Sequence, residues 1–338
     1  MRHCHSDFAM PSSPRFNPNP VHFVGHFDDP FAGAESSLLA LGAALSGQRT
    51  VRLWSDVTPH PYFAGQGVKA LNAFGGEFPK GGLLVFGGVH VRTGIWLEHA
   101  RPDRLALRYN LPNHGALFAM IEQLRDGTGL DPQIMFVCKA LQDSVGLPGR
   151  IDPSLIQIAP FLKTPVQRPS GRVFTVGRVS RDVSEKHHPD DPALYRMLAA
   201  RGLRVRVMGG TCLADQVGDV AGIELLQAGA QAVPGFLASL DAMFYRTGSI
   251  YETYGRVIFE AMASALPVVA AIDAGYADSV EGDHGVFLVG SQEQALSALS
   301  ALSADPGLRH ASGQKARDKV MALQNGIAVQ NTLENYLN

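Results

Sequence analysis

Two glutamates, Glu252 and Glu260, stand eight positions apart on either side of a glycine, Gly255. If a helix begins at Gly255 or Arg256, Glu252 lies in the loop before it and Glu260 lies just over one turn inside it. Both carboxylates can then face one cleft and accept hydrogen bonds from hydroxyl groups. The free N–H groups of residues 255–258 would form a positive helix end that suits a phosphate or electron-rich hydroxyls. The alternative is that Glu252 only caps the helix and Glu260 lies on a solvated face.

The segments that must position these residues alternate between short aliphatic runs and amphipathic stretches, which is typical of β-α units around a parallel sheet. The pattern predicts two successive α/β domains. In the first half, the expected strands are Val21–Gly25, Thr50–Trp54, Leu83–Phe86, Arg104–Asn110 and Ile134–Cys138, with helices near Gly33–Ser46 and Leu117–Arg125.

The second half repeats this alternation. Its expected strands are Arg172–Val176, Leu203–Met208, Ile223–Leu226, Ala242–Tyr245, Pro267–Ala271 and Val286–Val289, and its expected helices are Asp191–Arg201, Val233–Ser239, Arg256–Ala265, Gln292–Ser303 and a closing stretch, Ala311–Leu337. The segment from Ala159 to Gly171 contains Pro160, Pro165 and Pro169. Because proline disfavours helices and central strands, we expect an interdomain linker there and a boundary near residue 165.

Size and charge agree with two globular domains and exclude some functions. The chain has 338 residues, of which 46% are hydrophobic and 18% charged, and its formal net charge is -2. Residues 1–165 carry a net charge of +1 and residues 166–338 a net charge of -3. Neither half has the basic balance of a protein that binds nucleic acid by neutralising phosphates, so we expect no nucleic-acid partner.

Targeting signals are also lacking. Residues 1–20 hold four prolines and no apolar run like that of a signal peptide, so we expect a loose extension there. The longest apolar stretch, Ala265–Ile272, is far shorter than the roughly 18 residues of a membrane span. The three cysteines are widely separated and form no Cys-x-x-Cys pair, which disfavours a disulfide framework or a zinc site. A cytoplasmic location is the simplest expectation.

Several common enzyme signatures are missing from the sequence. The first expected strand leads into residues 26–30, which read HFDDP, instead of the G-x-G-x-x-G turn of dinucleotide-binding proteins. The chain also lacks a G-x-x-x-x-G-K-[ST] phosphate loop, a G-x-S-x-G nucleophile elbow and an H-E-x-x-H helix. These absences disfavour a dehydrogenase, a P-loop NTPase, an α/β-hydrolase and a zincin-type protease.

The stretch around the two glutamates resembles the retaining GT-B glycosyltransferases of family four, whose mark is E-x7-E followed by A-M-A-x-G-x-P-V-V. Here Glu252 and Glu260 are followed by residues 261–269, AMASALPVV, with Ala265 at the usual glycine. The resemblance implies an α/β protein with two Rossmann-like domains facing a central cleft and a C-terminal helix crossing back to the first domain. We therefore expect an extension at 1–20, an acceptor domain at 21–165 and a nucleotide-sugar donor domain at 166–338.

The same resemblance implies roles for the residues of the motif. In this family, the residue corresponding to Glu252 contacts the donor sugar, and the residue corresponding to Glu260 binds the ribose hydroxyls. The donor also lies against the backbone at the start of the helix. The positions that match this part of the donor site are Tyr254, Gly255, Arg256 and Val257.

Residues 177–186 resemble the family's G-R…K-G segment, which neutralises the diphosphate. Arg178 and Lys186 would act there on the leaving group, where charge develops as the glycosidic bond breaks. Arg181 is an alternative to Arg178, and His187 replaces the family glycine. The resemblance implies no metal ion and no cofactor, with the nucleotide-diphosphate sugar as substrate.

Weaker matches concern the remaining walls of the expected cleft. Gly209 follows a strand where the family has a glycine turn beside the nucleotide, and Gly33 lies in a stretch, residues 31–35, that resembles the family's G-G-A-E loop. Relatives often carry a histidine at the end of a first-domain strand, where this chain has Asn110. Asn110 and His114 are candidate sugar or acceptor contacts, and His90 is a further candidate.

The resulting hypothesis is a metal-independent glycosyltransferase that transfers a sugar, with retention, from a nucleotide-diphosphate sugar to an acceptor hydroxyl. The acceptor would be a carbohydrate or a lipid-linked molecule, and the hypothesis leaves open peripheral contact with the inner face of the membrane. Two alternatives are another GT-B activity, such as a sugar-nucleotide epimerase or a phosphorylase, and a non-catalytic module that binds sugar nucleotides.

Overall fold

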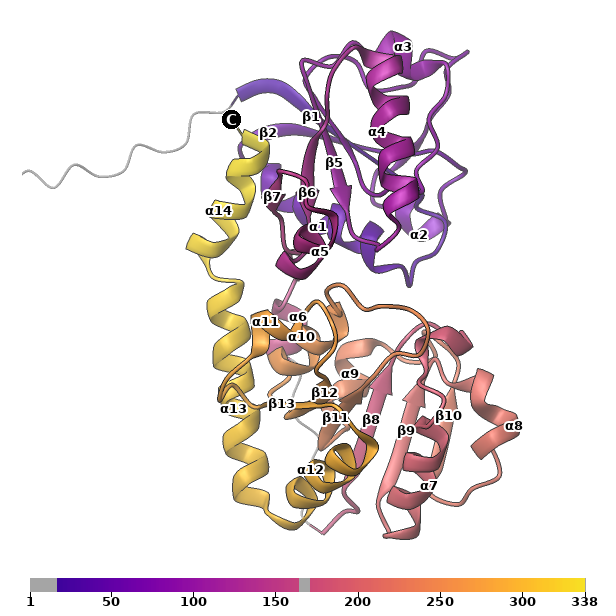
Figure 1. The fold of residues 1–338 in the computed structure, drawn as a ribbon, viewed down its shortest axis with the longest axis vertical. Coiled ribbons are helices and arrows are strands. Elements are labelled where there is room, and N and C mark those ends of the chain that lie inside the picture. The colour runs from indigo at the N-terminus through magenta and orange to yellow at the C-terminus, as the bar shows by residue number, and fades with distance from the viewer. Residues whose placement is uncertain (1–16, 164–170, 338) are drawn as a thin grey trace, which may run out of the picture.

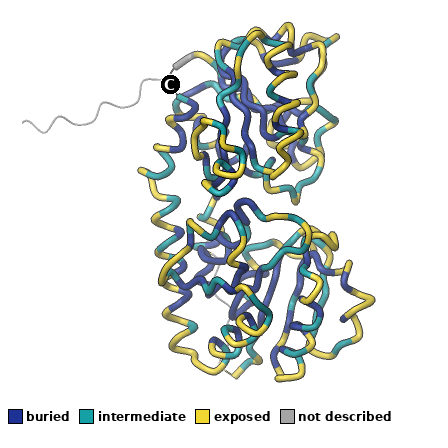
Figure 2. Tube along the Cα trace, viewed as in Figure 1, coloured by how far each residue is buried: buried dark blue, intermediate teal, exposed yellow. Residues whose placement is uncertain are grey.

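The computed structural model describes residues 17–163 and 171–337, which form two α/β domains stacked end to end (Figure 1). The expected boundary near residue 165, together with Pro165 and Pro169, lies outside the described residues. Each domain is built around a parallel sheet covered by helices. The central strands of both sheets are deeply buried, as expected for parallel sheets that have helices on both faces (Figure 2).

The first sheet has seven strands in the order β3-β2-β1-β4-β5-β6-β7, and every neighbouring pair is parallel. All five strands expected in the first half are present. The strands are β1 (Asn17–Gly25), β2 (Arg49–Ser55), β3 (Lys69–Ala70), β4 (Leu83–Phe86), β5 (Arg104–Tyr109), β6 (Gln133–Phe136) and β7 (Arg150–Ile151). The helices are α1 (Gly33–Leu45), α2 (Pro61–Ala64), α3 (Trp96–Ala100), α4 (His114–Thr128) and α5 (Lys139–Val145).

Two segments expected to be irregular are regular. Strand β1 begins at Asn17, inside the expected extension, because Asn17 already pairs with Arg49 of β2. Helix α6 (Ala159–Lys163) lies in the expected linker. Pro160 does not prevent this helix because the first turn of a helix needs no intrahelical N–H donor at that position.

The second sheet has six parallel strands in the order β10-β9-β8-β11-β12-β13. They are β8 (Thr175–Val179), β9 (Arg204–Met208), β10 (Ile223–Leu226), β11 (Ala242–Tyr245), β12 (Val268–Ala271) and β13 (Val286–Val289). The accompanying helices are α7 (Asp191–Ala200), α8 (Ala214–Val217), α9 (Val233–Ala238), α10 (Arg256–Ala263), α11 (Ala277–Val280) and α12 (Gln292–Ala304). Two short 3-10 helices, η1 (Ser184–Lys186) and η2 (Thr211–Leu213), follow β8 and β9.

The expected strand Arg172–Val176 is wrong by three residues, because β8 begins at Thr175 and runs through Gly177. The glycine was expected to end the strand. Instead it lies inside the strand, where the side chain of Leu240 packs directly against its backbone. A Cβ at this position would overlap that side chain. The shift moves Arg178 from a loop into the sheet.

The chain ends in two helices instead of one continuous helical stretch. Helix α13 (Pro306–Leu323) runs along the second domain, and α14 (Gly326–Leu337) continues to the first domain (Figure 1). There, the Tyr336 hydroxyl donates a hydrogen bond to Asp152 Oδ2 at 2.6 Å. Leu333 and Tyr336 also belong to the apolar core of the first domain. The expected return of the C-terminal helix is therefore confirmed.

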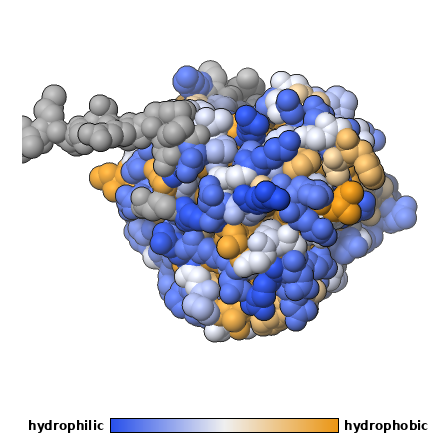
Figure 3. Space-filling view, turned by 90° about the horizontal axis from the view of Figure 1, so that it is seen from above, coloured by the Kyte–Doolittle hydropathy of each residue, from blue (hydrophilic) through white to orange (hydrophobic). Residues whose placement is uncertain are grey.

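None of the helices in the described part of the chain is both long and apolar enough to cross a bilayer. Seen from above, the described residues at the first-domain end are mostly hydrophilic, with apolar side chains scattered among them (Figure 3).

Candidate active site between the two domains

A cavity of about 1030 Å³ lies between the two domains. Its walls are loops that follow the carboxyl ends of β1, β4 and β5 in the first domain and of β8 and β11 in the second, together with the starts of α1 and α10. Ligands of open parallel sheets bind outside the carboxyl ends of the strands. A smaller hollow of about 530 Å³ borders the opposite, amino ends of β8 and β9, so the interdomain cavity is the candidate site.

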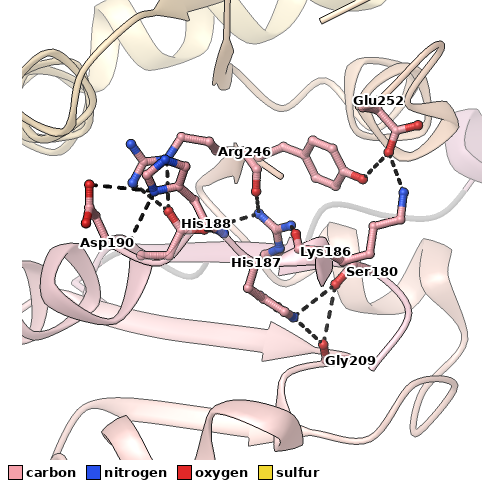
Figure 4. A network of polar contacts seen from close by, with 11 residues as sticks. Ser180, Lys186, His187, His188, Asp190, Gly209, Arg246 and Glu252 are labelled. Atoms are coloured by element: carbon pink, nitrogen blue, oxygen red, sulfur yellow. Dashed lines mark hydrogen bonds and ion pairs between the residues drawn. The ribbon is translucent and has the colours of Figure 1, made fainter. Parts of the chain in front are cut away.

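Glu252 lines this cavity with both carboxylate oxygens already engaged. Its Oε2 accepts hydrogen bonds from Lys186 Nζ at 2.8 Å and from the Tyr245 hydroxyl at 2.6 Å, as Figure 4 shows. Its Oε1 accepts one from the Gly255 N–H at 3.2 Å. Glu252 therefore does cap the helix region, as the alternative interpretation held, but it also faces the cavity.

These partners keep Glu252 ionised. Burial raises the pKa of its carboxyl, but the charge of Lys186 and the hydrogen bonds from Lys186, Tyr245 and the Gly255 N–H outweigh burial, and the net pKa lies below the ordinary value. Burial and the neighbouring Glu252 charge raise the pKa of Tyr245 well above its ordinary value. Tyr245 thus stays a neutral hydrogen-bond donor.

Helix α10 begins at the cavity as the sequence predicts. Gly255 precedes it with φ +63°, a left-handed conformation that residues with a Cβ rarely adopt. A Cβ at this position would also lie 3.0 Å from Tyr276 Cδ1. Because Gly255 makes this turn, the first N–H groups of α10 begin directly at the cavity wall.

Arg256 and Glu260 form one turn of α10 that lines the cavity. Arg256 Nη2 lies 3.9 Å from Glu260 Oε1, and Arg256 Nη1 donates to the carbonyl of Leu155 in the first domain at 2.7 Å. Burial raises the pKa of Glu260, and the charge of Arg256 offsets this only in part. Glu260 is thus a partly desolvated acceptor in the cavity, and not the solvated face residue of the alternative interpretation.

The other residues expected in this segment also border the cavity. Tyr254 is buried, and its ring stacks on Phe259 with a centroid distance of 4.6 Å. Val257 is half-buried and lines the cavity beside Tyr254. Both therefore contribute shape and apolar surface at the start of α10.

Arg178 is not where the sequence placed it. It lies within β8, is 1% exposed and is absent from the cavity wall. Its guanidinium donates to the backbone carbonyls of Arg246, at 2.6 Å, and of Lys186, and lies over the Tyr245 ring at 4.6 Å. The geometry corrects the expectation that Arg178 contacts a diphosphate: it holds the β8, η1 and β11 segments together.

Lys186 and Arg181 are the cations of this segment that line the cavity. Lys186 ends η1, and Arg181 is exposed in the loop between β8 and η1. Of the two arginines left open by the sequence, Arg181 is therefore the one positioned for an anionic ligand. The shift in the start of β8 explains the difference, because it leaves Arg181, and not Arg178, in the loop.

His187, which stands where the resembling family has glycine, packs inside the second domain and helps to hold two loops together. It is buried, and its Nε2 lies 2.8 Å from the carbonyl of Gly209, which links the β8 and β9 loops (Figure 4). Burial, together with the charge of Arg178, lowers the pKa of His187 to about 4, so the ring stays neutral. Gly209 has φ +81°, and a Cβ there would overlap the carbonyl of Ser180. Gly209 therefore supports the wall from behind and does not line the cavity.

The first-domain candidates divide into two groups. Asn110 and Gly33 line the cavity. His114 does not: it starts α4, is exposed and lies 3.3 Å from Ser144 Oγ. Asn113 caps α4, so His114 is turned into the first turn of the helix and away from the cavity.

Two residues that line the cavity, Glu35 and His26, were not predicted as site residues from the sequence. Glu35 lies in the first turn of α1, and His26 follows β1 directly. The signal that could have found them is their place after predicted strands, because loops at the carboxyl edge of a parallel sheet converge. Among the described residues, no group of three or more His, Cys, Asp or Glu side chains is arranged to hold a metal ion.

Comparisons with known proteins bear on the family of the second domain and on the fold. Residues 171–305, most of the second domain, match the family model of glycosyl transferases group 1. No curated protein sequence is significantly similar to the chain.

Many solved structures have a similar fold, among them the following three. The structure of Anabaena Alr3699/HepE in complex with UDP and glucose is 16% identical, with a TM-score of 0.70 over 94% of this chain and 99% of that one. Sucrose-phosphate synthase from Thermosynechococcus elongatus is also 16% identical, with a TM-score of 0.70 over 94% and 98%. WaaG, a glycosyltransferase involved in lipopolysaccharide biosynthesis, is 15% identical, with a TM-score of 0.61 over 94% and 99%. The expected GT-B architecture is thereby confirmed.

Proposed function

We propose that the protein is a glycosyltransferase that transfers a sugar from a nucleoside-diphosphate sugar to an acceptor hydroxyl in the interdomain cavity. The observation that carries the proposal is the convergence of Glu252, Glu260, Lys186 and the start of α10 on that cavity. The family match over residues 171–305 supports the assignment of the donor site to the second domain. Because the HepE structures hold UDP, uridine nucleotides are the first donors to test.

The proposed reaction uses the positive charge of the second-domain wall. As the glycosidic bond breaks, negative charge grows on the departing diphosphate. Lys186, Arg181 and the free N–H groups at the start of α10 would stabilise that charge, which is a fixed electrostatic contribution to the transition state. This set of charges supports transfer without a metal ion.

Retention of anomeric configuration is part of the proposal. Both carboxylate oxygens of Glu252 accept hydrogen bonds within the protein, which makes them poor nucleophiles. Glu252 is therefore proposed to hold a sugar hydroxyl and not to form a bond to the sugar. In the proposed course, the acceptor hydroxyl attacks from the face that the diphosphate leaves, and the leaving phosphate takes its proton. Glu260 would accept hydrogen bonds from the ribose hydroxyls.

The test is an assay of purified protein with UDP-sugars and hydroxyl acceptors, followed by NMR of the product. We expect release of UDP, an α-linked product from an α-linked donor, and unchanged rates after chelation of metals. An isomerised sugar nucleotide from the donor alone would instead indicate an epimerase. UDP binding without any turnover over a broad set of acceptors and water would overturn the enzymatic assignment.

A further inference from the structure

The side chain of Arg256 reaches from the second domain to the first. Its backbone begins α10, and a Cβ at Gly33, where α1 begins, would lie 3.3 Å from Arg256 Cδ. Its Nη1 donates a hydrogen bond to the carbonyl of Leu155 at 2.7 Å. The side chain is only 16% exposed. Arg256 therefore contacts the first domain both along its aliphatic stem and through its guanidinium.

The same guanidinium faces Glu260 in the next turn of α10. Arg256 Nη2 lies 3.9 Å from Glu260 Oε1, and both residues line the cavity. This distance permits an ion pair but is too long for a direct hydrogen bond. The contact therefore gives the carboxylate a neighbouring positive charge without using its acceptor oxygens.

The charges of this pair depend on each other because both side chains are mostly buried. Burial raises the pKa of Glu260 and lowers that of Arg256, and in each case the charge of the partner acts in the opposite direction. Arg108 of the first domain carries a like charge and lowers the pKa of Arg256 further. The hydrogen bond to Leu155 and the ion pair with Glu260 therefore stabilise the charged guanidinium together.

Leu155 is a firm anchor for this contact. Its side chain is buried and belongs to the apolar core of the first domain. The N–H of the next residue, Ile156, donates to Gln324 Oε1 at 3.0 Å. Because the backbone carbonyl of Leu155 is fixed in this way, the first domain helps to set the position of the Arg256 guanidinium.

The proposed function leaves the side chain of Arg256 without a role. It assigns the N–H groups at the start of α10 to the diphosphate and Glu260 to the ribose. Burying an arginine is unfavourable unless its charge is paired and its donors are satisfied, so this side chain requires its own explanation. Its two contacts supply one, because they join the carboxylate at the ribose to the opposite domain.

We propose that Arg256 is a positioning residue through which the first domain contributes to recognition of the ribose. Held by the Leu155 carbonyl, its guanidinium favours the charged form of Glu260 and directs that carboxylate into the cavity. The ribose hydroxyls then donate to a charged acceptor whose place depends on both domains. The inference deepens the proposed function and rests on its placement of the ribose at Glu260.

The test compares the binding of UDP and of 2′,3′-dideoxy-UDP to the full chain by calorimetric titration, because these ligands differ only in the ribose hydroxyls. Arg256→Met removes both contacts of the guanidinium. We expect it to weaken the binding of UDP about tenfold, as expected for loss of hydrogen bonds to a charged acceptor, and to leave the affinity for dideoxy-UDP unchanged. A merely structural role would weaken the binding of both ligands alike.

Two further variants separate the bridging role from simple charge. Arg256→Lys keeps a positive charge, but one ammonium group cannot replace the arginine fork that serves two partners, so its preference for UDP should stay below that of the wild type. Adding Glu260→Gln to Arg256→Met should cause no further loss, because both residues act through one interaction. Arg204→Met, the matched control, breaks an arginine–glutamate pair outside the cavity and should keep the wild-type preference.

The outcomes distinguish this inference from the proposed function. A wild-type preference for UDP in Arg256→Met or Arg256→Lys, or a further loss in the double variant, would overturn the inference alone. If Arg256→Met does not fold, Arg256→Gln replaces it with the same expectation, since glutamine can still donate to a carbonyl but carries no charge. Equal binding of both ligands by the wild type, or no binding of UDP, would instead contradict the placement of the ribose and the proposed function with it.

Discussion

Glu252 keeps its charge in a largely buried position because three donors converge on its two oxygens. Lys186 supplies the only charge among them, at 2.8 Å. Without that charge, burial is the dominant influence on the carboxyl, and its pKa rises. The pair therefore links the protonation state of the site to a single lysine.

Replacing Lys186 by methionine should lower kcat about tenfold to a hundredfold, because the leaving diphosphate loses a fixed positive charge. It should also move the acidic limb of the pH-rate profile to higher pH, because Glu252 then protonates more readily. Steady-state kinetics over pH would measure both effects. Lys315→Met, at an exposed lysine that does not line the cavity, is the control. An unshifted acidic limb would argue against the pairing of Lys186 with Glu252 in solution.

His187 is a buried neutral ring whose pKa is lowered to about 4 from the ordinary 6.5. Between these values the unfolded chain binds a proton that the folded protein does not, so stability must fall as pH decreases through this range. We expect His187→Gln to lose less stability than the wild type between neutral and acidic pH. Thermal unfolding at several pH values measures the slope, with exposed His310→Gln as the control. Identical slopes in all three proteins would contradict the structural position of His187.

At the scale of elements, the residue that follows the end of α10 has a strained backbone conformation. Ala265 has φ +54°, a left-handed conformation, at the position where the resembling family has glycine. Ala265→Gly should therefore raise the free energy of unfolding by about 0.5 to 1 kcal/mol. Ala301→Gly, in the exposed interior of α12, should lower it by a similar amount, since glycine weakens a regular helix. Chemical denaturation measures whether the free energy of unfolding rises in Ala265→Gly and falls in Ala301→Gly. A fall in both variants would show that Ala265 is not strained.

The bounds of the strands and helices show which parts of the fold could be predicted from the sequence. Strands β4, β10, β11 and β13 have the predicted bounds, because each is a short, mostly apolar run with polar or turn residues close to both ends. The start of α10 was predictable because Glu252, Gly255 and Glu260 form a motif within one short segment of the sequence. The start of β8 was not, since Leu240 covers Gly177 only in the folded sheet.

The same limit applied to the site. Arg178 and Arg181 are equivalent in the sequence, and only the register of β8 decides which one enters the cavity. Glu35 and His90 come together from loops after different strands, so no local pattern joins them. The largest part of the second-domain wall, residues 250–260, is one continuous segment, which is why a motif could predict it, whereas the first-domain wall is assembled from several separate segments.

For the molecule as a whole, α14 ties the end of the chain to the first domain. Tyr336 donates to Asp152, whose Oδ2 also accepts from Arg108 Nε, all in the buried interior. Tyr336→Phe should lower the free energy of unfolding by about 1 to 2 kcal/mol, because a buried carboxylate loses one donor. Denaturation with Tyr62→Phe as the exposed control measures this. Equal stability of both variants would show that the hydrogen bond from Tyr336 to Asp152 does not contribute to holding α14.

The central claim is that the cavity between the domains binds a nucleoside diphosphate with Glu260 against the ribose. Calorimetric titration of UDP and of 2′,3′-dideoxy-UDP into the wild type and Glu260→Gln tests it directly. The account predicts that the wild type prefers UDP by about tenfold, as expected for hydrogen bonds to a charged acceptor, and that the variant loses this preference. The same preference in both proteins, or no binding of UDP to the wild type, would contradict it.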